Sequence, residues 1–484
     1  MTYWYDQYIR MSVCQLKFFR KDPIPMMQQE NTLPDGPLVA WYADDFTGAA
    51  AVMEVLSFAG LPSMLFLAPP TQQQLARYPD LKGIGVASTA RAQSPDWMDA
   101  ELPAIFDQLA QLKPAILHYK VCSTLDSAPQ VGSIGRAIEI GAAVCAPAVV
   151  PVLIAAPQMG RYQCFGHLFA GFQDKVYRLD QHPVMSRHPV TPMHEADVAK
   201  HIAKQSPKLD IGCLSVDTVS TTPALPSLPA QPGRIAVVTL DCMDSRSEST
   251  AGRLIWDGRA ANPFVVGSQG IEYALVRHWQ DTGQILIHAA PKGIGRADKM
   301  VAVSGSVSPT TAAQIGWAKA NGFAGIAFDA TCVCATPRDV TQEIARCVGA
   351  GLHAMAQGLD PLIHTAQGPD DPAVDRFRAA VAASAQTMEQ ANQQIGEALG
   401  RVLHHILLAS GARRAVVSGG DTAGHATRQL GIFALSALAP TIAGAALFQA
   451  HAAGPMDGLE LALKGGQMGS PDYFGWIRDG GGLR

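Results

Sequence analysis

Two adjacent aspartates, Asp44 and Asp45, lie in the segment ADDFTG, between an apolar run at residues 38–43 and a helical pattern. A carboxylate at the start of a helix is most often a cap, because its oxygen accepts a hydrogen bond from a free backbone N–H. One helix needs only one such cap. We therefore interpret one carboxylate as an acceptor for substrate hydroxyls and the other as a general base or cap.

Charged and hydroxyl-bearing residues also follow the third and fourth predicted strands, in the segments STAR and KVCSTLDS. Ligands of open α/β sheets bind outside the carboxyl ends of the strands, so these residues are expected to converge. Arg and Lys can hold a carboxylate while Asp and Ser bind hydroxyls, which favours a small polyhydroxylated anion. Each residue alone is more often a cap or a surface group, and the recurrence at three strand ends carries the interpretation. The candidates are Thr47, Gly48, Ser88, Thr89, Arg91, Lys120, Ser123, Thr124, Asp126 and Ser127.

Gly-rich and Ser-rich turns follow predicted strands in the second half of the chain, in the segments SGS, SGGDT and KGGQMG. Glycine permits positive φ and lets backbone amides approach a ligand closely. A helical pattern follows SGGDT, so amide donors and a helix N-terminus would face an anion, most plausibly a phosphate. Three such turns in one domain indicate a nucleotide site. Its candidate residues are Ser304, Ser306, Ser418, Gly419, Gly420, Asp421, Thr422, Gly465 and Gly466.

Several familiar catalytic motifs are missing from the sequence. It has no Walker A motif, no GxGxxG after a first strand, no GxSxG and no HExxH, and DDFT lacks the spacing of DxDxT. The histidines His182, His188 and His194 lie among prolines in an extended segment without metal-ligand spacing, so we expect a structural or lid role. Cys332 and Cys334 have no second cluster and are expected in the core.

The composition narrows the class of protein. Of the 484 residues, 37 are Lys or Arg and 41 are Asp or Glu, without long runs of one sign, so nucleic acid and polybasic membrane contacts are not expected. Only 16% of residues are charged and 48% are hydrophobic, which excludes disorder. Nine cysteines without paired spacing and no secretory signal predict a cytoplasmic protein with reduced thiols. The sequence leaves a homo-oligomer open.

Residues 430–448 form a run of 19 residues without a charge, long enough to span a membrane. Pro440, Thr441 and Gly444 interrupt this run, and Ala dominates over Leu. We therefore predict a buried helix followed by a buried strand.

Short apolar runs alternate with helical patterns, which predicts an α/β fold with mainly parallel sheets covered by helices. The length allows about three domains or two large ones. The predicted strands lie near residues 38–43, 63–67, 83–87, 116–119, 149–154, 235–240, 301–304, 325–328, 361–364 and 414–418. The Pro-rich stretch 216–233 is expected to be a loop or linker, and the main domain boundary is expected near residue 295.

At these residues the sequence resembles the four-carbon acid sugar kinase family. The matching segments, in order, are ADDFTG, STAR, KVCSTLDS, APQMGR ending at Arg161, HPVTPM, FVVGSQGIEYAL, SGSVSPTTAAQI, SGGDTA and LALKGGQMG. They span about residues 38–478. The resemblance implies an extension at 1–36, a sugar-acid-binding domain at 37–290 and a nucleotide-binding domain at 295–484, with the active site in the cleft between the two domains. The Pro-rich stretch then becomes an internal loop of the first domain.

The resemblance implies a transferase of carbohydrate metabolism that uses ATP and Mg²⁺ to phosphorylate a hydroxyl of a four-carbon sugar acid, such as threonate, erythronate or 3-oxo-tetronate. ATP would be bound by Ser306, by residues 418–421 and by Gly466. Arg91 and Lys120 would orient the acid, with either Asp44 or Asp45 as base. No protein ligand is assigned to the metal.

Two departures from the family pattern stand out. Many relatives carry a polar stretch with an Asp where this chain has Ala49, Ala50 and Ala51, and the final turn has Gly465 where Ser is common. The alanine run motivates an alternative, a catalytically impaired sugar-acid and nucleotide-binding paralogue with a regulatory role. A sugar-phosphate phosphatase is the least favoured reading, because its motif is missing.

Overall fold

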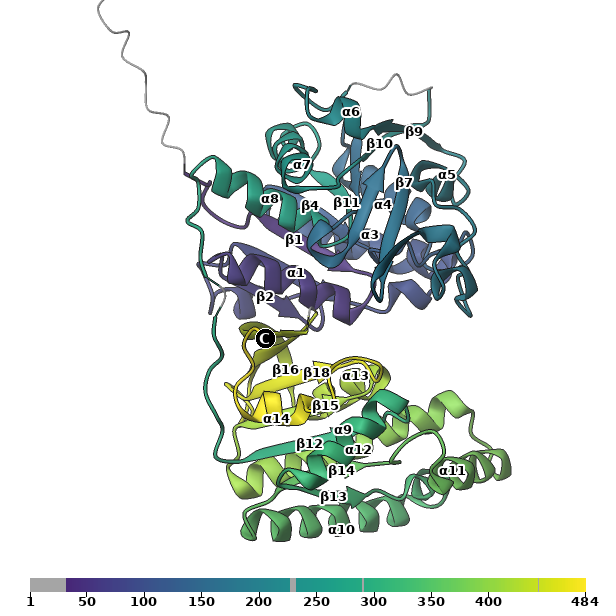
Figure 1. Cartoon of the computed structure of the whole chain (residues 1–484), viewed down its shortest axis with the longest axis vertical. Coiled ribbons are helices and arrows are strands. Elements are labelled where there is room, and N and C mark those ends of the chain that lie inside the picture. The colour runs from purple at the N-terminus through teal and green to yellow at the C-terminus, as the bar shows by residue number, and fades with distance from the viewer. Residues whose placement is uncertain (1–31, 227–231, 290, 443) are drawn as a thin grey trace, which may run out of the picture.

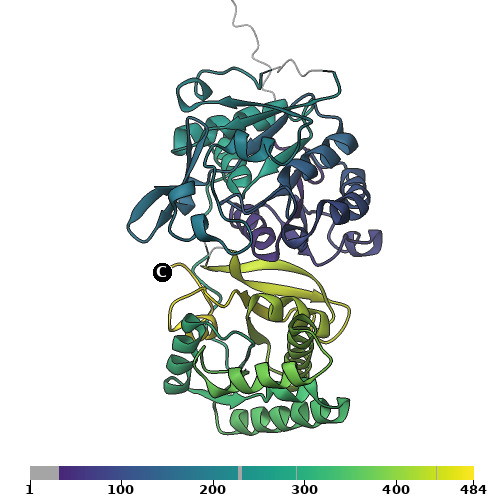
Figure 2. The ribbon, with the colours of Figure 1, turned by 90° about the vertical axis from the view of Figure 1, so that its right-hand side faces the viewer.

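The computed structural model describes residues 32–226, 232–289, 291–442 and 444–484. Figures 1 and 2 show two lobes stacked along the long axis, one coloured purple to teal and the other green to yellow. The chain after the first lobe runs along one side of the molecule before it enters the second (Figure 1). The predicted N-terminal extension falls outside the described residues except at 32–36.

The first lobe is built on eight parallel strands in the order β2-β3-β1-β4-β11-β5-β10-β9. Six of the predicted strands lie here within two residues of their expected ends, whereas β9 and β11 were not predicted. The strands are β1 (Val39–Ala43), β2 (Ser63–Phe66), β3 (Gly83–Ala87), β4 (Ile116–Lys120), β5 (Val150–Leu153), β9 (Leu209–Leu214), β10 (Ile235–Leu240) and β11 (Phe264–Gly267).

Helices cover both faces of this sheet. Consecutive strand residues point to opposite faces, and Trp41 and Tyr42 of β1 are both buried, each in a different hydrophobic cluster. The helices are α1 (Phe46–Phe58), α2 (Gln72–Leu75), α3 (Pro95–Gln111), α4 (Ile134–Cys145), α5 (Val198–Ala203), α6 (Val216–Val219), α7 (Ser245–Gly258) and α8 (Gly270–Asp281). The sequence did not predict a small antiparallel sheet of β6 (Arg161–Cys164), β7 (His167–Phe172) and β8 (Lys175–Arg178).

The second lobe has five parallel strands, in the order β13-β14-β12-β15-β18, followed by the antiparallel strands β17 and β16. The strands are β12 (Met300–Ser304), β13 (Phe323–Ala327), β14 (Asp360–His364), β15 (Arg414–Ser418), β16 (Ile432–Ile442), β17 (Ala445–Ala452) and β18 (Glu460–Lys464). The helices are α9 (Pro309–Ala320), α10 (Pro337–Ala356), α11 (Pro372–Ala383), α12 (Met388–Ser410), α13 (Gly420–Gln429) and α14 (Tyr473–Arg478).

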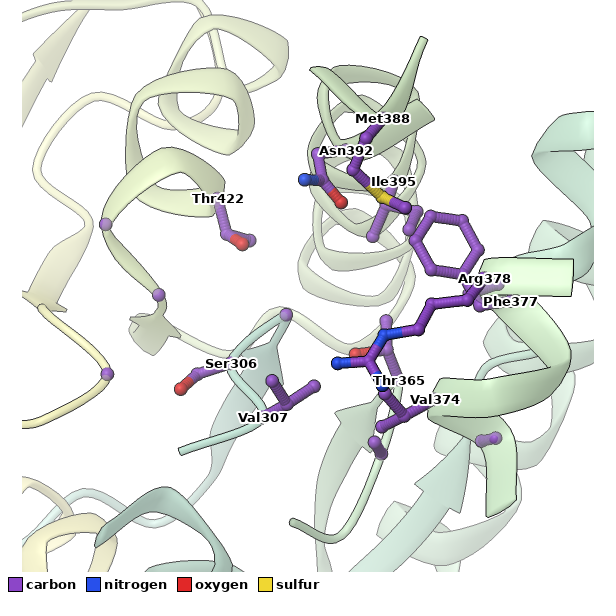
Figure 3. Close-up of a pocket in the computed structure, with 17 residues that line it drawn as sticks. Ser306, Val307, Thr365, Val374, Phe377, Arg378, Met388, Asn392, Ile395 and Thr422 are labelled. Atoms are coloured by element: carbon purple, nitrogen blue, oxygen red, sulfur yellow. The ribbon is translucent and has the colours of Figure 1, made fainter. Parts of the chain in front are cut away.

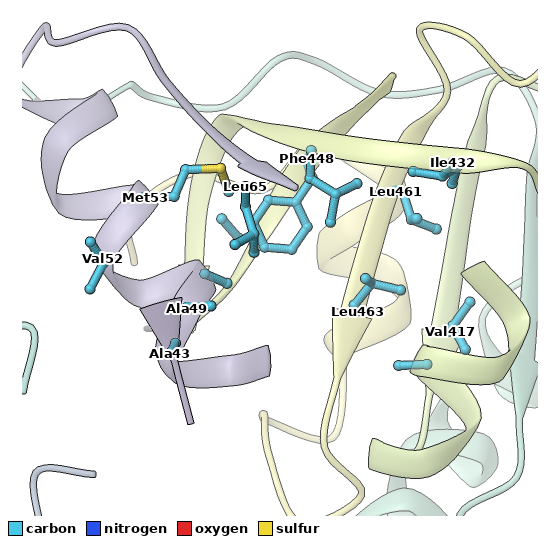
Figure 4. Packing of buried hydrophobic residues seen from close by; sticks show 14 of the residues in the cluster. Ala43, Ala49, Val52, Met53, Leu65, Val417, Ile432, Phe448, Leu461 and Leu463 are labelled. Carbon is cyan, nitrogen blue, oxygen red and sulfur yellow. The ribbon is translucent and has the colours of Figure 1, made fainter. Parts of the chain in front are cut away.

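The expected mainly parallel, helix-covered α/β architecture is confirmed, and the strands of both lobes join into one sheet of 15 strands. The junction is an antiparallel pairing of β16 with β2, in which Ala434 and Leu435 face Phe66 and Leu65. Figure 4 shows Met53 of α1 beside Phe448 of β17 in a core that continues from one lobe into the other. The two lobes therefore share backbone pairing as well as hydrophobic packing.

The prediction of a buried helix in residues 430–448 is wrong, because β16 and β17 form a hairpin there. Gly431 has a φ of +65° and lies just after α13, and Gly444 has a φ of +79° at the turn between the strands. Pro440, which has no N–H to donate, coincides with an irregular register between Ala439 and Ile442. No helix within the described ranges is both long and apolar enough to cross a membrane.

The Pro-rich stretch 216–233 lies inside the first lobe, between β9 and β10. It begins with the short helix α6, and residues 227–231 fall outside the described residues. It is therefore an internal connection rather than a linker between the lobes.

Candidate functional site

Asp44 and Arg91 form a buried ion pair at the carboxyl ends of β1 and β3. Arg91 Nη2 donates to Asp44 Oδ1 at 2.7 Å, and its Nε donates to Asp44 Oδ2 at 3.2 Å. The backbone adds to this arrangement, since the Arg91 N–H donates to the Asp44 carbonyl at 2.9 Å. Both oxygens of Asp44 are thus occupied by one guanidinium, which fixes the orientation of Arg91.

Asp45 is the cap of α1, and its carboxylate is only partly occupied. Its Oδ1 accepts from the Gly48 N–H at 3.0 Å and from Arg91 Nη2 at 2.6 Å. Its Oδ2 has no hydrogen bond among the described residues, and a quarter of the side chain is exposed. Asp45 therefore caps the helix with one oxygen and keeps the other free of hydrogen bonds among the described residues.

Lys120, at the end of β4, brings a second cation to the same place. Its side chain is buried, and Nζ donates to the Val121 carbonyl at 2.7 Å. A Cβ at position 48 would lie 2.7 Å from Lys120 Nζ and 2.5 Å from Asp45 Oδ1. Gly48 thus leaves the space into which the ammonium and the carboxylate approach each other.

The other candidates after β4 contact neighbouring segments of the protein. Asp126 accepts a hydrogen bond from the hydroxyl of Thr191, and His188 Nδ1 lies 3.8 Å from its Oδ1. Ser127 Oγ donates to the Leu125 carbonyl at 2.9 Å and receives a hydrogen bond from Gln205 Nε2 at 2.9 Å. Asp126 is therefore where the histidine-containing segment docks, and the hydroxyl of Ser127 is bonded to Leu125 and Gln205.

The hydroxyl candidates after β3 and β4 lie in the turns. Ser88 Oγ donates to the Ala43 carbonyl at 2.7 Å, and Thr124 Oγ1 lies 3.0 Å from Cys122 Sγ. Thr89 Oγ1 accepts from Gln93 at 3.3 Å, and Ser123 is almost wholly buried.

Of the candidates in the first lobe, the structure thus brings together Asp44, Asp45, Gly48, Arg91 and Lys120 as one polar cluster, which we call the acid site.

Burial raises the pKa of Asp44 from its ordinary 3.8 to about 6, partly offset by attraction to Arg91. A carboxyl with a raised pKa in the folded state stabilises the fold fully below its unfolded pKa and loses that contribution as the pH rises through the folded value. The loss for Asp44 falls between about pH 3.8 and pH 6 and amounts to about 3 kcal/mol.

We expect Asp44→Asn to remove this dependence. From about pH 4 to about pH 7, wild type should lose about 3 kcal/mol of unfolding free energy relative to the variant, measured by urea denaturation. A difference between the two proteins that stays constant across this range would contradict the buried, pKa-raised state of Asp44.

A cavity of about 370 Å³ lies at the carboxyl ends of β12, β14 and β15 and extends to α11 and α12 (Figure 3). One end is lined by the predicted turns and the other by apolar side chains. The lining residues that the sequence predicted are Ser306, Gly419, Gly420, Thr422 and Gly466. This division into an amide-rich end and an apolar end suits a nucleotide, with phosphates at the first and a base at the second.

Missing Cβ atoms let the turns at the first end pack closely. A Cβ at Gly305 would lie 2.3 Å from Thr422 Oγ1, and one at Gly466 would lie 2.3 Å from Ser306 Oγ. The predicted helix, α13, begins inside SGGDT at Gly420, and its N-cap Gly419 makes no side-chain cap. Backbone N–H groups at the start of α13 are therefore available to an anion.

The remaining nucleotide candidates lie beneath or beside the cavity. Ser304 and Ser418 are wholly buried, and Ser304 Oγ accepts from the Ser306 N–H at 3.4 Å. Gly465 belongs to the turn but does not line the cavity. Asp421 belongs to α13, and its side chain lies outside the described residues.

Lys464 adds a buried cation behind the last turn. Its Nζ donates to the Gly465 carbonyl at 3.1 Å and lies 5.7 Å from the centre of the Tyr473 ring. Burial lowers the pKa of Lys464 to about 8. A positive charge therefore lies next to Gly466, at the end of the cavity that suits phosphates.

Sequence reasoning missed the apolar end of the cavity. Its apolar residues are Val374, Phe377, Met388 and Ile395 of α11 and α12, and the polar Arg378 and Asn392 lie among them (Figure 3). No motif marks these positions. Thr365 also lines the cavity, and it directly follows the predicted strand 361–364, so the rule of strand ends could have found it.

Neither the histidine segment nor the cysteines form a metal centre in the part of the chain that the structure describes. His188 Nδ1 lies 2.9 Å from Thr191 Oγ1, within the segment that docks on Asp126. Among the described residues eight cysteines are free thiols; Cys332 lies in the core as predicted, whereas Cys334 is only partly buried against it. No three His, Cys, Asp or Glu side chains in the described ranges are grouped to hold a metal ion.

Comparison with known domains divides the chain into two units. Residues 39–275 match the model of a sugar-binding N-terminal domain, and residues 301–474 match that of a nucleotide-binding C-terminal domain. The chain is thus a two-domain protein that joins a sugar-binding unit to a nucleotide-binding unit.

Curated relatives extend over nearly the whole chain. A 3-oxo-isoapionate kinase of Paraburkholderia graminis is 43% identical over 92% of this chain and 95% of its own length. A 3-oxo-tetronate kinase of Methylobacterium radiotolerans is 30% identical over 90% of this chain and 97% of its own length. This chain belongs to the four-carbon acid sugar kinase family.

A solved structure, that of Haemophilus influenzae protein HI1011, has the same fold. Its TM-score is 0.69 at 19% identity, over 91% of this chain and 99% of that chain. At this identity the likeness speaks for the fold alone.

Ala49, Ala50 and Ala51 are buried in α1, and Ala49 appears in Figure 4 within the core shared by the two lobes. The Trp41 indole N–H donates to the Ala49 carbonyl at 3.2 Å. Successive helical residues point in directions about 100° apart, so three buried alanines in a row show that this part of α1 is buried on more than one side.

Proposed function

We propose that this chain is an ATP-dependent kinase that phosphorylates a hydroxyl of a 3-oxo sugar acid. The 43% identity to a 3-oxo-isoapionate kinase makes 3-oxo-isoapionate the first candidate substrate, and 3-oxo-tetronate the second. The structural observation that carries the proposal is the pairing of a two-cation, two-carboxylate site with a Gly-lined cavity in one chain.

Each charged residue of the acid site has a role in this proposal. Arg91 and Lys120 hold the carboxylate of the sugar acid, and the buried carboxylate of Asp44 keeps Arg91 in place. Asp45 Oδ2, which is free of hydrogen bonds among the described residues, accepts the hydrogen of the attacking hydroxyl. The contacts of Asp45 thus favour it over Asp44 as the base.

The cavity of the second lobe orients ATP. Phe377 and Ile395 at the apolar end contact the base, while the N–H groups at the start of α13 and the turns with Ser306 and Gly466 bind the phosphates. The Ser306 and Thr422 hydroxyls and the phosphates offer oxygen ligands, so a magnesium ion held mainly by ATP fits this donor set. Bound magnesium neutralises phosphate charge during transfer.

We propose the active site between the lobes, with domain boundaries of 37–290 and 295–484. Two contacts support this arrangement. The Gly444 turn lies against Thr47 of the acid-site helix, and Ile442 lies against Gly469 of the last phosphate turn. Closure of the two lobes over both ligands would exclude water and suppress ATP hydrolysis. Free thiols in the described chain support a cytoplasmic location.

The regulatory alternative is not favoured. That alternative was based on the alanine run, and the alanine run lies in the core. The relatives that match nine-tenths of the chain are named as kinases.

A substrate panel tests the proposal. ADP release is measured with 3-oxo-isoapionate, 3-oxo-tetronate, threonate and erythronate. We expect both 3-oxo acids to accelerate ADP release, with kcat/KM about 10-fold higher for 3-oxo-isoapionate, because one altered substituent changes transition-state binding by about 1–3 kcal/mol. Nucleotide binding without acceleration by any acid would contradict the kinase proposal.

A further inference from the structure

Glu54 is a buried carboxylate in the middle of α1 that has no role in the site described above. Its Oε2 accepts from the Gly444 N–H at 3.0 Å, and its Oε1 accepts from the Ala446 N–H at 3.0 Å. Both donors lie at the turn between β16 and β17, in the other lobe. Glu54 therefore ties the acid-site helix to this turn with both oxygens.

The turn lies between the two ligand sites. A Cβ at Gly444 would lie 2.8 Å from both Thr47 Cγ2 and the Thr47 carbonyl, and Thr47 is two residues after Asp45. On its other side, Ile442 Cδ1 lies 3.0 Å from the position of a Cβ at Gly469. Gly469 lies three residues after Gly466, and Gly466 lines the nucleotide cavity.

No Lys or Arg pairs with Glu54 within the described residues, so two backbone N–H groups offset the cost of burying its carboxylate. The titratable groups whose pKa values the charge of Glu54 raises are Tyr273 on α8 and Tyr473 on α14. Burial raises its pKa to about 7, and the bonds from Ala446 and Gly444 counteract this effect. Well-packed apolar residues often stabilise a core better than a buried carboxylate does. The two hydrogen bonds of Glu54 therefore explain a carboxylate at this position better than core packing does.

We propose that Glu54 is a positioning residue that holds Gly444 and Ala446, beside Thr47, together with the end of β16 at Ile442, beside Gly469, and thereby sets the spacing of the acid site and the phosphate turn. This inference rests on the proposed kinase function. Phosphoryl transfer needs near in-line alignment, and a misplacement of about 1 Å can cost about 100-fold in rate.

The test compares Glu54→Gln and Glu54→Ala with wild type. Gln keeps the volume and one acceptor, whereas Ala removes both. We expect kcat to fall about 10-fold in Gln and about 100-fold in Ala, while the KM for the sugar acid and the Kd for ADP stay within about 3-fold. Amide hydrogen exchange at Gly444 and Ala446 should accelerate about 10-fold in Gln and further in Ala.

Glu139→Gln is the matched control. Glu139 is a carboxylate of α4 that accepts from Lys208 Nζ at 3.1 Å, from Ser206 and from Arg136, and none of these donors is Gly444 or Ala446. Its kcat should stay within about 2-fold of wild type, with unchanged exchange at the turn.

Two results would overturn the inference. One is wild-type kcat in both Glu54 variants, and the other is a parallel loss of kcat, acid binding and ADP binding, which marks general unfolding. The proposed function fails separately if wild type releases no ADP with any sugar acid. In that case unchanged exchange at Gly444 and Ala446 would still overturn the role of Glu54, and faster exchange would support its hold on the turn.

Discussion

Replacing Asp45 with Asn is expected to lower kcat by about 10²- to 10⁴-fold, the usual contribution of a positioned general base. The Asn oxygen can keep the hydrogen bonds that Oδ1 accepts from Gly48 and Arg91. The amide nitrogen that replaces Oδ2 cannot accept the hydrogen of a substrate hydroxyl. The variant should therefore fold, retain ADP affinity within about 3-fold and fail at transfer, as measured by steady-state kinetics and calorimetric titration.

The control for this variant is Asp244→Asn. Asp244 is the N-cap of α7, and its Oδ1 accepts from the Ser247 N–H at 2.8 Å. Asn caps helices about as well as Asp, so neither activity nor stability should change. If Asp45→Asn kept wild-type kcat, Asp45 would not be the base, and Asp44 would become the remaining candidate of the pair.

Replacing Gly419 with Ala is expected to raise the Kd for ADP about 10- to 100-fold, equivalent to about 1–3 kcal/mol of backbone strain at the phosphate turn. Gly419 has a φ of +126°, which L side chains rarely adopt. Its Cβ would lie 2.8 Å from Thr422 Oγ1 and 3.2 Å from Thr422 Cβ, so the first turn of α13 would shift. Calorimetric titration with ADP measures the effect.

Gly424→Ala, in the same helix, is the matched control. A Cβ at Gly424 meets no atom within 4 Å. Ala is a better helix former than Gly by about 0.5–1 kcal/mol, so this variant should be as stable as wild type or more so, with unchanged ADP affinity. Equal ADP affinity in Gly419→Ala and Gly424→Ala would place the phosphates elsewhere.

The strands and the polar edge of the sheet could be predicted because both are local in sequence. Apolar runs mark parallel strands, and the residue after each run marks the ligand edge. The cluster of Asp44, Asp45, Arg91 and Lys120 follows from that rule alone. The rule also gathered Ser127, whose contacts with Leu125 and Gln205 depend on tertiary packing.

The hairpin of β16 and β17 could not be predicted in the same way. Most of its residues are buried, so neither strand alternation nor a helical stripe appears in the sequence. The apolar end of the nucleotide cavity could not be predicted either, because Phe377 and Ile395 are ordinary apolar residues of helices. The bonds of Glu54 join residues about 390 positions apart, for which a single sequence carries no signal.

The central claim is that the γ-phosphoryl group of ATP passes to a sugar acid. Mass spectrometry of a reaction with ATP, Mg²⁺ and 3-oxo-isoapionate tests it most directly. We predict a phosphorylated acid formed in equal amount to ADP, and about 1% of that amount or less with Asp45→Asn in the same time. ADP accompanied only by inorganic phosphate, or an acid that stays unmodified while ATP binds, would contradict the account.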